Sequence, residues 1–215
     1  QNICEVCSAH TEHVNMAVEM LEKKPEVYTM DPHDVSEILT SIKDISKIIG
    51  KEKEGNGLID SLSKRLEFVR GKTFEKKQKV VAIEWVDPFF TSGHWIPEMI
   101  EVAGGENLIS SEKMPSRKMK LEEIKEANPD IIVVMPCGFD VKRTINEYKK
   151  VLAGNPEWNE LKAVKENNVY AVDANSYFSK PSLRTITGIE ILASIFHPDV
   201  FGDLQLPEDS FMKIN

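Results

Sequence analysis

Aromatic side chains and a histidine gather in the segment EWVDPFFTSGHWIPEMIEVAGG, which runs from Glu84 to Gly105. Several of them lie among Pro, Gly, Ser and Thr, which are typical of loops: Phe89, Phe90, His94 and Trp95. Aromatic rings offer a large apolar contact area, and an imidazole offers hydrogen bonds or a metal-binding nitrogen. The segment therefore predicts a ligand-binding loop. The alternative for any single ring is that it covers the top of the core.

The cysteines and two further histidines give a weaker signal. Cys4 and Cys7 form a CxxC, which is compatible with a disulfide, with half of a zinc site or with free thiols. His10 and His13 would supply two more zinc ligands a few residues on, with Cys137 as a remote candidate. We expect free thiols, no resident metal and no cofactor.

No catalytic motif competes with the binding loop. The sequence contains no GxSxG, no Walker phosphate loop, no HExxH and no GxGxxG after a strand. Cys137 and His94 could act as nucleophile and base, but a small buried thiol is the commoner arrangement. His94 has two other interpretations, as a ligand to a metal carried inside the bound molecule or as a hydrogen-bonding group. We expect a binding protein and no enzyme.

Alternating strands and helices must position these residues. Strands are expected at Val80–Trp85, Asp130–Met135 and Val169–Asp173, and helices at Pro97–Val102, Leu121–Ala127, Val141–Leu152 and Pro181–Phe196. This order favours an α/β lobe with a mainly parallel sheet. Trp85, still within its strand, is expected in the core.

Each expected strand is followed by a loop with aromatic residues. Parallel strands put such loops on one side of the sheet, where open α/β sheets bind ligands. The rings expected at this rim are Phe89, Phe90, Trp95, Phe139, Tyr177 and Phe178, and the polar groups beside them are Ser92, His94, Asn175 and Ser176. A flat or broad apolar ligand is implied, and sugar, siderophore, haem and corrinoid all remain open.

The first part of the chain predicts a second, incomplete lobe. Helices are expected at Thr11–Lys23 and Asp34–Ile49, with a short strand at Glu26–Met30 between them. A further helical pattern at Leu58–Arg70, extending through Phe74 towards Lys77, is expected to be a rigid connector. We therefore divide the chain into part of an N-terminal lobe (1–54), a connecting helix (55–78) and a C-terminal α/β lobe (79–215).

Composition limits the partners of the protein. The 215 residues carry a net charge of -8, which argues against nucleic acid as a partner because phosphate contacts need a basic face. No apolar stretch is long enough to span a bilayer, and no signal peptide is recognised. Since the chain begins at Gln1, we expect a processed or truncated piece. Exposed strand edges in a truncated lobe would favour self-association.

Several segments resemble a known family: EWVDPFFTSGHWIPEMIEVAGG, PDIIVVMPCGFD, WNELKAVKENNVYAVDANSYFSKPSLRTITGIEILASIFHP and the opening QNICEVC. They are similar to the cobalamin-binding branch of the helical-backbone (class III) substrate-binding proteins, which serve ABC transporters of cobalamin, siderophores and haem. The resemblance covers nearly the whole chain. Family members usually have further strands and helices before the QNICEVC segment.

The resemblance implies two Rossmann-like lobes joined by one long helix, with the ligand held between them. The implied ligand is cobalamin or a related corrinoid, bound by Phe89, Phe90, His94, Trp95, Phe139, Tyr177 and Phe178. The implied partner is an ABC permease, for which Glu12 is the candidate docking residue. The implied location is extracytoplasmic, periplasmic or anchored on the outer face of the membrane.

Three alternatives remain open. A ferric siderophore or haem would suit the same fold. Because free thiols suit a reducing compartment, a cytoplasmic corrinoid-binding protein competes with a transport role. A thiol-dependent enzyme or sensor using Cys137 or the Cys4–Cys7 pair belongs to a different class, and alkylation of a reactive thiol would then abolish its activity.

Overall fold

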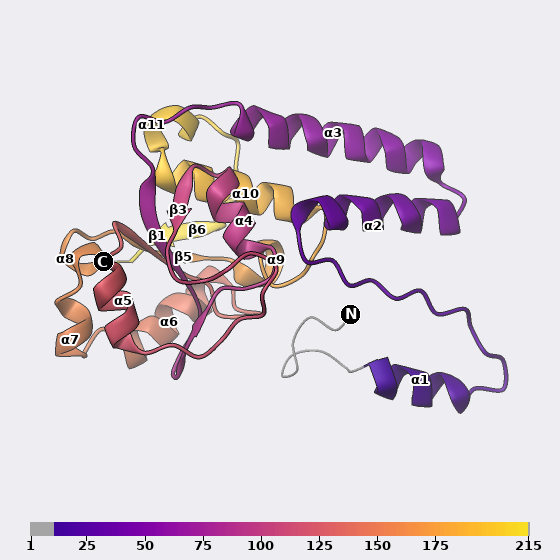
Figure 1. The fold of residues 1–215 in the computed structure, drawn as a ribbon, viewed down its shortest axis with the longest axis horizontal. Helices are drawn as coiled ribbons and strands as arrows, with labels where there is room; N and C mark the ends of the chain where they lie inside the picture. The colour runs from indigo at the N-terminus through magenta and orange to yellow at the C-terminus, as the bar shows by residue number, and fades with distance from the viewer. Residues whose placement is uncertain (1–10, 215) are drawn as a thin grey trace.

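The computed structural model describes residues 11–214. The helices are α1 (Thr11–Glu19), α2 (Val35–Ile48), α3 (Glu52–Arg70), α4 (Ile96–Val102), α5 (Leu121–Ala127), α6 (Val141–Val151), α7 (Pro156–Asn159), α8 (Lys162–Lys165), α9 (Ala174–Tyr177), α10 (Arg184–Phe196) and α11 (Pro198–Phe201). The strands are β1 (Gln78–Val86), β2 (Phe89–Thr91), β3 (Gly105–Asn107), β4 (Ile131–Val134), β5 (Val169–Val172) and β6 (Phe211–Lys213). The α/β class is confirmed, and Figure 1 shows the arrangement of these elements.

One mixed sheet organises the second lobe, with strand order β2-β1-β4-β5-β6 and with β3 paired to β1. The central strands β1, β4 and β5 are parallel, in a register that aligns Val81 with Ile132 and Val133 with Tyr170. The edge strands β2 and β6 are antiparallel to their neighbours. All four residues of β4 are buried, as expected for a strand covered on both faces. The predicted parallel sheet is thus correct for its centre and incomplete at its edges.

Helices cover both faces of the sheet (Figure 1). One core cluster joins the sheet to α2, α3, α4 and α10 through residues such as Leu66, Met99 and Ile189. The other joins the opposite face to α5, α6, α7 and α8 through residues such as Ile124 and Trp158. The layers form because the faces that these helices turn towards the sheet are apolar.

The connecting helix α3 is longer at its start and shorter at its end than expected. It begins at Glu52 and ends at Arg70, and Gly71 follows as the C-cap. At 1.5 Å per residue it spans roughly 28 Å. Figure 1 shows α2 and α3 side by side, extending together away from the sheet. They pack closely at Gly55, where an added Cβ would lie 2.3 Å from the Cβ of Ser46.

The first part of the chain differs from the prediction. The expected strand at Glu26–Met30 is absent, and α1 ends at Glu19, before the expected Lys23. The physical reason is that a strand needs an edge to pair with, and the described residues offer none in this region. Val27 and Tyr28 are about half exposed. In Figure 1, α1 lies apart from the remainder of the fold.

Some expected groups lie beyond the structural description. Cys4, Cys7 and His10 fall outside the described residues, and although Glu12 lies within α1, its side chain also falls outside them. Among the helices from α1 to α11, none combines the length and the apolar composition that crossing a membrane requires.

Candidate functional site

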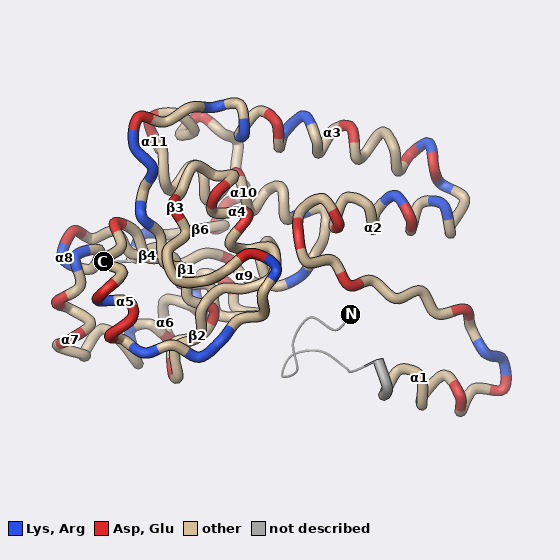
Figure 2. Tube along the Cα trace, viewed as in Figure 1, with Lys and Arg blue, Asp and Glu red and all other residues tan. Residues whose placement is uncertain are grey.

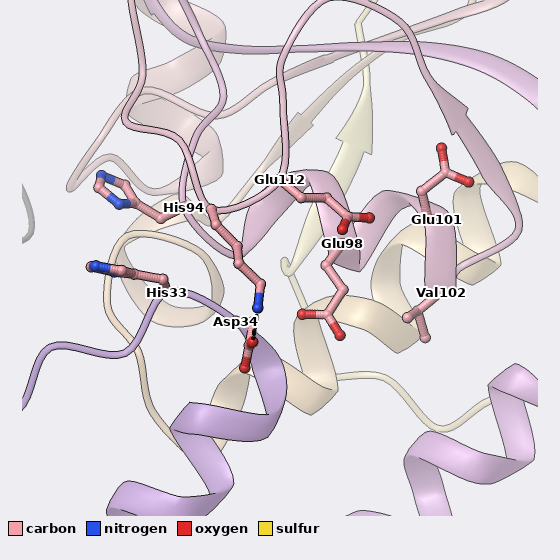
Figure 3. Close-up of a pocket in the computed structure, with 8 residues that line it drawn as sticks. His33, Asp34, His94, Glu98, Glu101, Val102 and Glu112 are labelled. Atoms are coloured by element: carbon pink, nitrogen blue, oxygen red, sulfur yellow. Dashed lines mark ion pairs between the residues drawn. The ribbon is translucent and has the colours of Figure 1, made fainter.

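A pocket of about 450 Å³ lies where the start of α2 meets the second lobe. It is lined by His33, Asp34, His94, Glu98, Glu101, Val102, Glu112 and Lys113. Figure 3 shows that these side chains come from the segment before α2, the loop before α4, helix α4 and the loop that carries Glu112. The pocket therefore joins the first part of the chain to the loop that the sequence singles out.

The backbone of the second lobe fixes His94 in place. The N–H of His94 donates a hydrogen bond to the carbonyl oxygen of Met114 at 2.7 Å, and its own carbonyl accepts one from Lys113 at 3.0 Å. His94 has a φ of 55°, in the left-handed region that most side chains avoid. At the neighbouring Gly93, an added Cβ would lie 2.3 Å from the backbone nitrogen of Ser116. The two loops are thus held against each other with no room for a larger residue.

The carboxyl group of Glu84 is hydrogen-bonded to the backbone of this loop. Glu84, near the end of β1, accepts a hydrogen bond of 3.2 Å from the backbone N–H of Gly93. Burial raises the pKa of Glu84 to about 7, while hydrogen bonds from Gly93 and the side chain of Ser116 act in the opposite direction. Glu84 is therefore a carboxyl group that titrates near neutral pH beside the His94 loop.

Ionic and hydrogen-bonded contacts hold α2 against the second lobe at the pocket. Asp34 caps α2 by accepting a 2.7 Å hydrogen bond from the backbone N–H of Glu37. Lys113 Nζ pairs with Asp34 at 2.8 Å. Burial alone would raise the pKa of Asp34, but hydrogen bonds from Lys113, Glu37 and Ser36 outweigh it and leave that pKa lowered.

The pocket is acidic. Asp34, Glu98, Glu101 and Glu112 contribute carboxyl groups, and Lys113 contributes the one positive charge among the lining residues. Figure 2 shows acidic positions on α4 and at the start of α2. Burial raises the pKa of Glu98, a change that the hydrogen bond from the backbone N–H of Val35 opposes. Such a pocket favours neutral hydrogen-bond donors or positive charge over anions.

Two imidazoles lie at one end of the pocket. The ring centroids of His33 and His94 are 6.2 Å apart, and the ring planes are inclined by 40°. In the described part of the chain, Nδ1 of His33 is buried without a hydrogen-bond partner. Its Nε2 lies 3.7 Å from the carboxylate of Asp31. Nowhere in residues 11–214 do three or more His, Cys, Asp or Glu side chains form a group that could hold a metal ion.

Three of the predicted ligand-binding rings lie in the core. Trp95, Phe139 and Phe178 are 2%, 5% and 3% exposed. Trp95 Nε1 donates a 3.1 Å hydrogen bond to the carbonyl oxygen of Phe178. The ring of Trp95 therefore helps to fix the backbone of the loop that carries Phe178. In this structure these three rings are buried and do not line the pocket, and their contact with a ligand stays a prediction. Trp95 and Phe178 belong to the core cluster that also contains residues of α4 and α10. Phe139 lies under the guanidinium of Arg143 and against the ring of Trp85.

The remaining predicted rings are partly accessible. Phe89 and Phe90 lie in β2 and are half-buried, and Phe89 stacks on Trp158 with centroids 5.7 Å apart. Tyr177 is also half-buried and packs against the core. These residues do not line the pocket, and their contact with a ligand stays a prediction. Of the predicted ligand-binding residues, the pocket includes His94.

Trp85 is exposed, contrary to the prediction that it belongs to the core. It is 38% exposed, donates a 3.1 Å hydrogen bond from Nε1 to the carbonyl oxygen of Asp87, and meets Phe139 edge to face. At this position β1 pairs with the edge strand β2, with Trp85 opposite Phe90.

The predicted polar groups have other partners. Ser92 is buried and bonded to Ser110 at 2.8 Å, and Asn175 accepts a hydrogen bond from Lys180. Cys137 is a half-buried free thiol that does not line the pocket.

Sequence reasoning missed most of the pocket. His33 and Asp34 carry a usable signal, because an Asp directly before an apolar-periodic segment predicts a helix N-cap and thereby places the preceding histidine at a helix start. Glu98, Glu101 and Lys113 carry no such signal, since charged residues on a short helix and in a loop are usually solvated. Their convergence depends on how α4 packs beside α2.

Comparison with known proteins places this architecture in a family. The family model described as periplasmic binding protein matches residues 6–176. An uncharacterized ABC transporter substrate-binding lipoprotein of Bacillus subtilis, YvrC, is 31% identical over 80% of this chain and 54% of its own length. The high-affinity heme uptake system protein IsdE of Staphylococcus aureus is 26% identical over 75% of this chain and 56% of its own. The chain thus spans about half the length of these relatives.

Solved structures share the fold. An ABC transporter substrate-binding protein from Listeria monocytogenes superposes with a TM-score of 0.71 at 23% identity, covering 80% of this chain and 68% of that chain. The periplasmic vitamin B12 binding protein BtuF of Vibrio cholerae superposes with a TM-score of 0.65 at 18% identity, covering 90% and 71%. On the strength of the family match over residues 6–176, the chain belongs to the periplasmic binding protein family.

Proposed function

We propose that this chain is a ligand-binding part of the substrate-binding protein of an ABC importer, and that its ligand is cobalamin or a related corrinoid. The observation that carries the proposal is the acidic pocket between α2 and the His94 loop, because it joins the first part of the chain to the second lobe. It would bind without covalent chemistry. The family match and the ABC transporter relatives support the importer assignment.

Charge is the reason for preferring a corrinoid. A corrin ring is rimmed by neutral carboxamides, whose N–H groups donate hydrogen bonds to carboxylates such as Glu101 and Glu112. Haem carries two propionates and many ferric siderophores are anionic, so both would meet like charge in this pocket. A corrinoid is larger than about 450 Å³, so the pocket would hold its edge and leave the remainder against neighbouring surfaces.

Haem is the second candidate, and the two imidazoles favour it. Histidine is a common axial ligand of haem iron, and His33 and His94 lie together at one end of the pocket. The relative IsdE is named for heme uptake, and BtuF is named for vitamin B12 binding. Both ligands therefore belong in the test, together with a ferric siderophore.

The importer role implies a membrane partner. We propose that the protein acts on the outer side of the membrane and docks on an ABC permease, with Glu12 as a docking residue. The lipoprotein description of YvrC supports this location.

Calorimetric titration tests the proposal. Cobalamin, cobinamide, haem and a ferric hydroxamate siderophore are each added to the chain, with a Glu101→Gln/Glu112→Gln double variant beside it. We expect saturable corrinoid binding that weakens in the double variant, and haem binding that strengthens there. Glu106→Gln is the matched control, since Glu106 is exposed and does not line the pocket. Binding of haem or siderophore with no binding of either corrinoid would overturn the corrinoid assignment.

A further inference from the structure

We propose that the exposed face of α6 binds a membrane surface that carries anionic lipid headgroups. We call it the basic face, and it consists of exposed residues: Lys142, Arg143, Asn146, Lys149 and Lys150. The opposite face of the helix is buried through Val141, Thr144 and Tyr148. The choice of a membrane rests on the proposed function, which places the protein on the outer side of one.

The basic face is narrow and free of acidic residues. Because successive residues of a helix are about 100° apart, its five side chains fall within an arc of about 120°. Lys142 and Lys150 are separated along the helix axis by roughly 12 Å. The acidic residue nearest to this arc on α6 is Glu147, which is half-buried at its border. Four positive charges and one neutral amide therefore point to the same side.

The four cations of the basic face have no ion-pair partner within the described residues. The neighbouring helices of the same layer do pair their cations. Lys125 of α5 contacts Glu157 of α7 at 2.7 Å, and Lys165 of α8 contacts Glu160. In a chain with a net charge of -8, the basic face is thus a local patch of uncompensated positive charge.

Helix stability does not account for all four cations. Lys149 and Lys150 lie in the last turn, where positive charge interacts favourably with the helix dipole. Lys142 and Arg143 lie in the first turn, where the same dipole disfavours them, and no acidic residue accompanies them in that turn. Cations at both ends of one helix face indicate a role outside the helix itself.

An exposed indole ring lies at one end of the basic face. The guanidinium of Arg143 lies 3.7 Å from the ring centre of Phe139, and Trp85 meets the same ring with centroids 5.4 Å apart. Trp85 is 38% exposed. Tryptophan favours the boundary between water and lipid because it combines an apolar ring with a polar N–H. A lipid surface can therefore use both the charges and the ring.

A second copy of the chain is a poorer fit to the basic face. The carboxylates of the acidic pocket already have partners, since Asp34 pairs with Lys113 and Glu101 pairs with Lys77. The layer that contains α6 packs on the face of the sheet opposite α2 and α3 (Figure 1). Contact with a membrane through α6 would thus leave the pocket beside α2 accessible to its ligand.

Vesicle flotation tests the inference on the full chain. Vesicles of phosphatidylcholine with about one third phosphatidylglycerol are compared with vesicles of phosphatidylcholine alone. We expect saturable binding to the anionic vesicles at low salt, with loss of binding at high salt because the charges are screened. Lys149→Gln/Lys150→Gln should weaken binding by roughly 25-fold, at about fivefold for each basic residue. Binding should also shift the tryptophan emission to shorter wavelength, and Trp85→Phe should remove that shift.

Lys53→Gln/Lys64→Gln is the matched control, because it removes the same charge from exposed positions on α3. Its binding should stay within about twofold of that of the parent, since these positions lie more than a screening length from the bound surface. Equal binding to neutral and anionic vesicles, or an equal loss in both double variants, would overturn the inference. Binding of duplex DNA without binding of vesicles would overturn the lipid assignment in favour of nucleic acid.

The corrinoid titration separates this inference from the proposed function. A chain that binds corrinoid but no anionic vesicles would overturn the inference and leave the proposed function standing. A chain that binds anionic vesicles through the basic face but binds no corrinoid, haem or siderophore would overturn the proposed function and support the lipid surface.

Discussion

Glu98 accepts a hydrogen bond of 2.8 Å from the backbone N–H of Val35, so a side chain of α4 caps the first residue of α2. Its other carboxylate oxygen accepts a 3.3 Å hydrogen bond from Arg70, the last residue of α3. One carboxylate of the second lobe thus ties both helices of the first part of the chain to the wall of the pocket. The position of His33, two residues before Val35, depends on this contact.

Glu98→Ala is expected to lower the free energy of unfolding by about 1–2 kcal/mol, the range for loss of a helix cap. The reason is that the N–H of Val35 loses its acceptor in a partly buried site. Chemical denaturation measures the change, and hydrogen exchange should show faster opening of the first turn of α2. Glu106→Ala provides an exposed carboxyl for comparison. Unchanged exchange in α2 would contradict the capping role.

The ion pair between Arg65 and Glu190 joins α3 to α10. Arg65 Nε donates to Glu190 at 2.8 Å, and Nη2 donates to Thr187 at 2.8 Å. The side chain of Glu190 is 10% exposed and that of Arg65 is 40% exposed. Arg65→Ala leaves the buried carboxylate of Glu190 unpaired and should lower the free energy of unfolding by about 2 kcal/mol. Breaking a fully buried ion pair costs about 3–5 kcal/mol, and the cost here is smaller because Arg65 is partly solvated.

The matched test replaces both partners with apolar residues. Arg65→Met/Glu190→Leu should recover most of the stability lost in Arg65→Ala, since removing both charges leaves none buried without a partner. Denaturant midpoints of the two variants and of Glu190→Leu measure this. A double variant no more stable than Arg65→Ala would show that the pair itself, and not the orphaned charge, holds α3 to α10.

Truncation of Trp95 should lower the free energy of unfolding much more than truncation of Trp85. Trp95→Ala creates a cavity in the core and is expected to cost about 3–5 kcal/mol, whereas Trp85→Ala removes a ring that is 38% exposed and should cost about 1 kcal/mol or less. Thermal unfolding measures both. If Trp95→Ala unfolds at the same temperature as the parent, its burial does not stabilise the fold. Because of this cost, loss of ligand binding in Trp95→Ala would be no evidence of a ligand contact.

The sequence predicted the central elements well because their patterns are local. β1, β4 and β5 were expected as apolar runs, and α5 was expected with the bounds that it has, because hydrophobic periodicity and caps lie within one segment. The edge strands β2, β3 and β6 have no such pattern. They are three residues each and are strands because a neighbouring backbone pairs with them.

The site was harder to predict for a related reason. An aromatic residue in or beside a loop has the same sequence signal whether its ring is buried, as that of Trp95 before α4 is, or exposed, as that of Trp85 at the end of β1 is. Only the helix packed above it decides, and that depends on residues far away in the chain, such as Phe178 beside Trp95. His94 was identified from its loop, whereas Glu98 was not, because its role arises from contact with α2.

Self-association is expected through the end of α2, where Ile48 and the C-cap residue Ile49 are 58% and 63% exposed. Adjacent exposed aliphatic side chains favour contact between molecules. Light scattering at increasing concentration should show a rising mean mass, and Ile48→Lys/Ile49→Lys should return the mass to that of a monomer. A single chain mass at every concentration for the parent protein would contradict this expectation.

Glu84 should make the stability fall as the pH rises from about 4.5 to 7. The pKa of its carboxyl is raised by burial to about 7 in the folded protein, from a usual value of 4.5. As the pH rises, Glu84 therefore loses its proton in the unfolded chain first, and the folded state binds more protons between pH 4.5 and 7. By about pH 7 this lowers the free energy of unfolding by roughly 3 kcal/mol. Above about pH 7 both states are ionised and this contribution no longer changes.

Glu84→Gln isolates that contribution, because glutamine keeps an oxygen for the N–H of Gly93 and has no proton to lose. The free energy of unfolding of the variant, minus that of the parent, should rise by roughly 2–3 kcal/mol between pH 5 and pH 8. Urea titrations at the two pH values measure it, and titration of other groups cancels in the difference. A difference that does not vary with pH would show that Glu84 ionises as readily in the folded chain as in the unfolded one, and that the His94 loop does not rest on a neutral carboxyl.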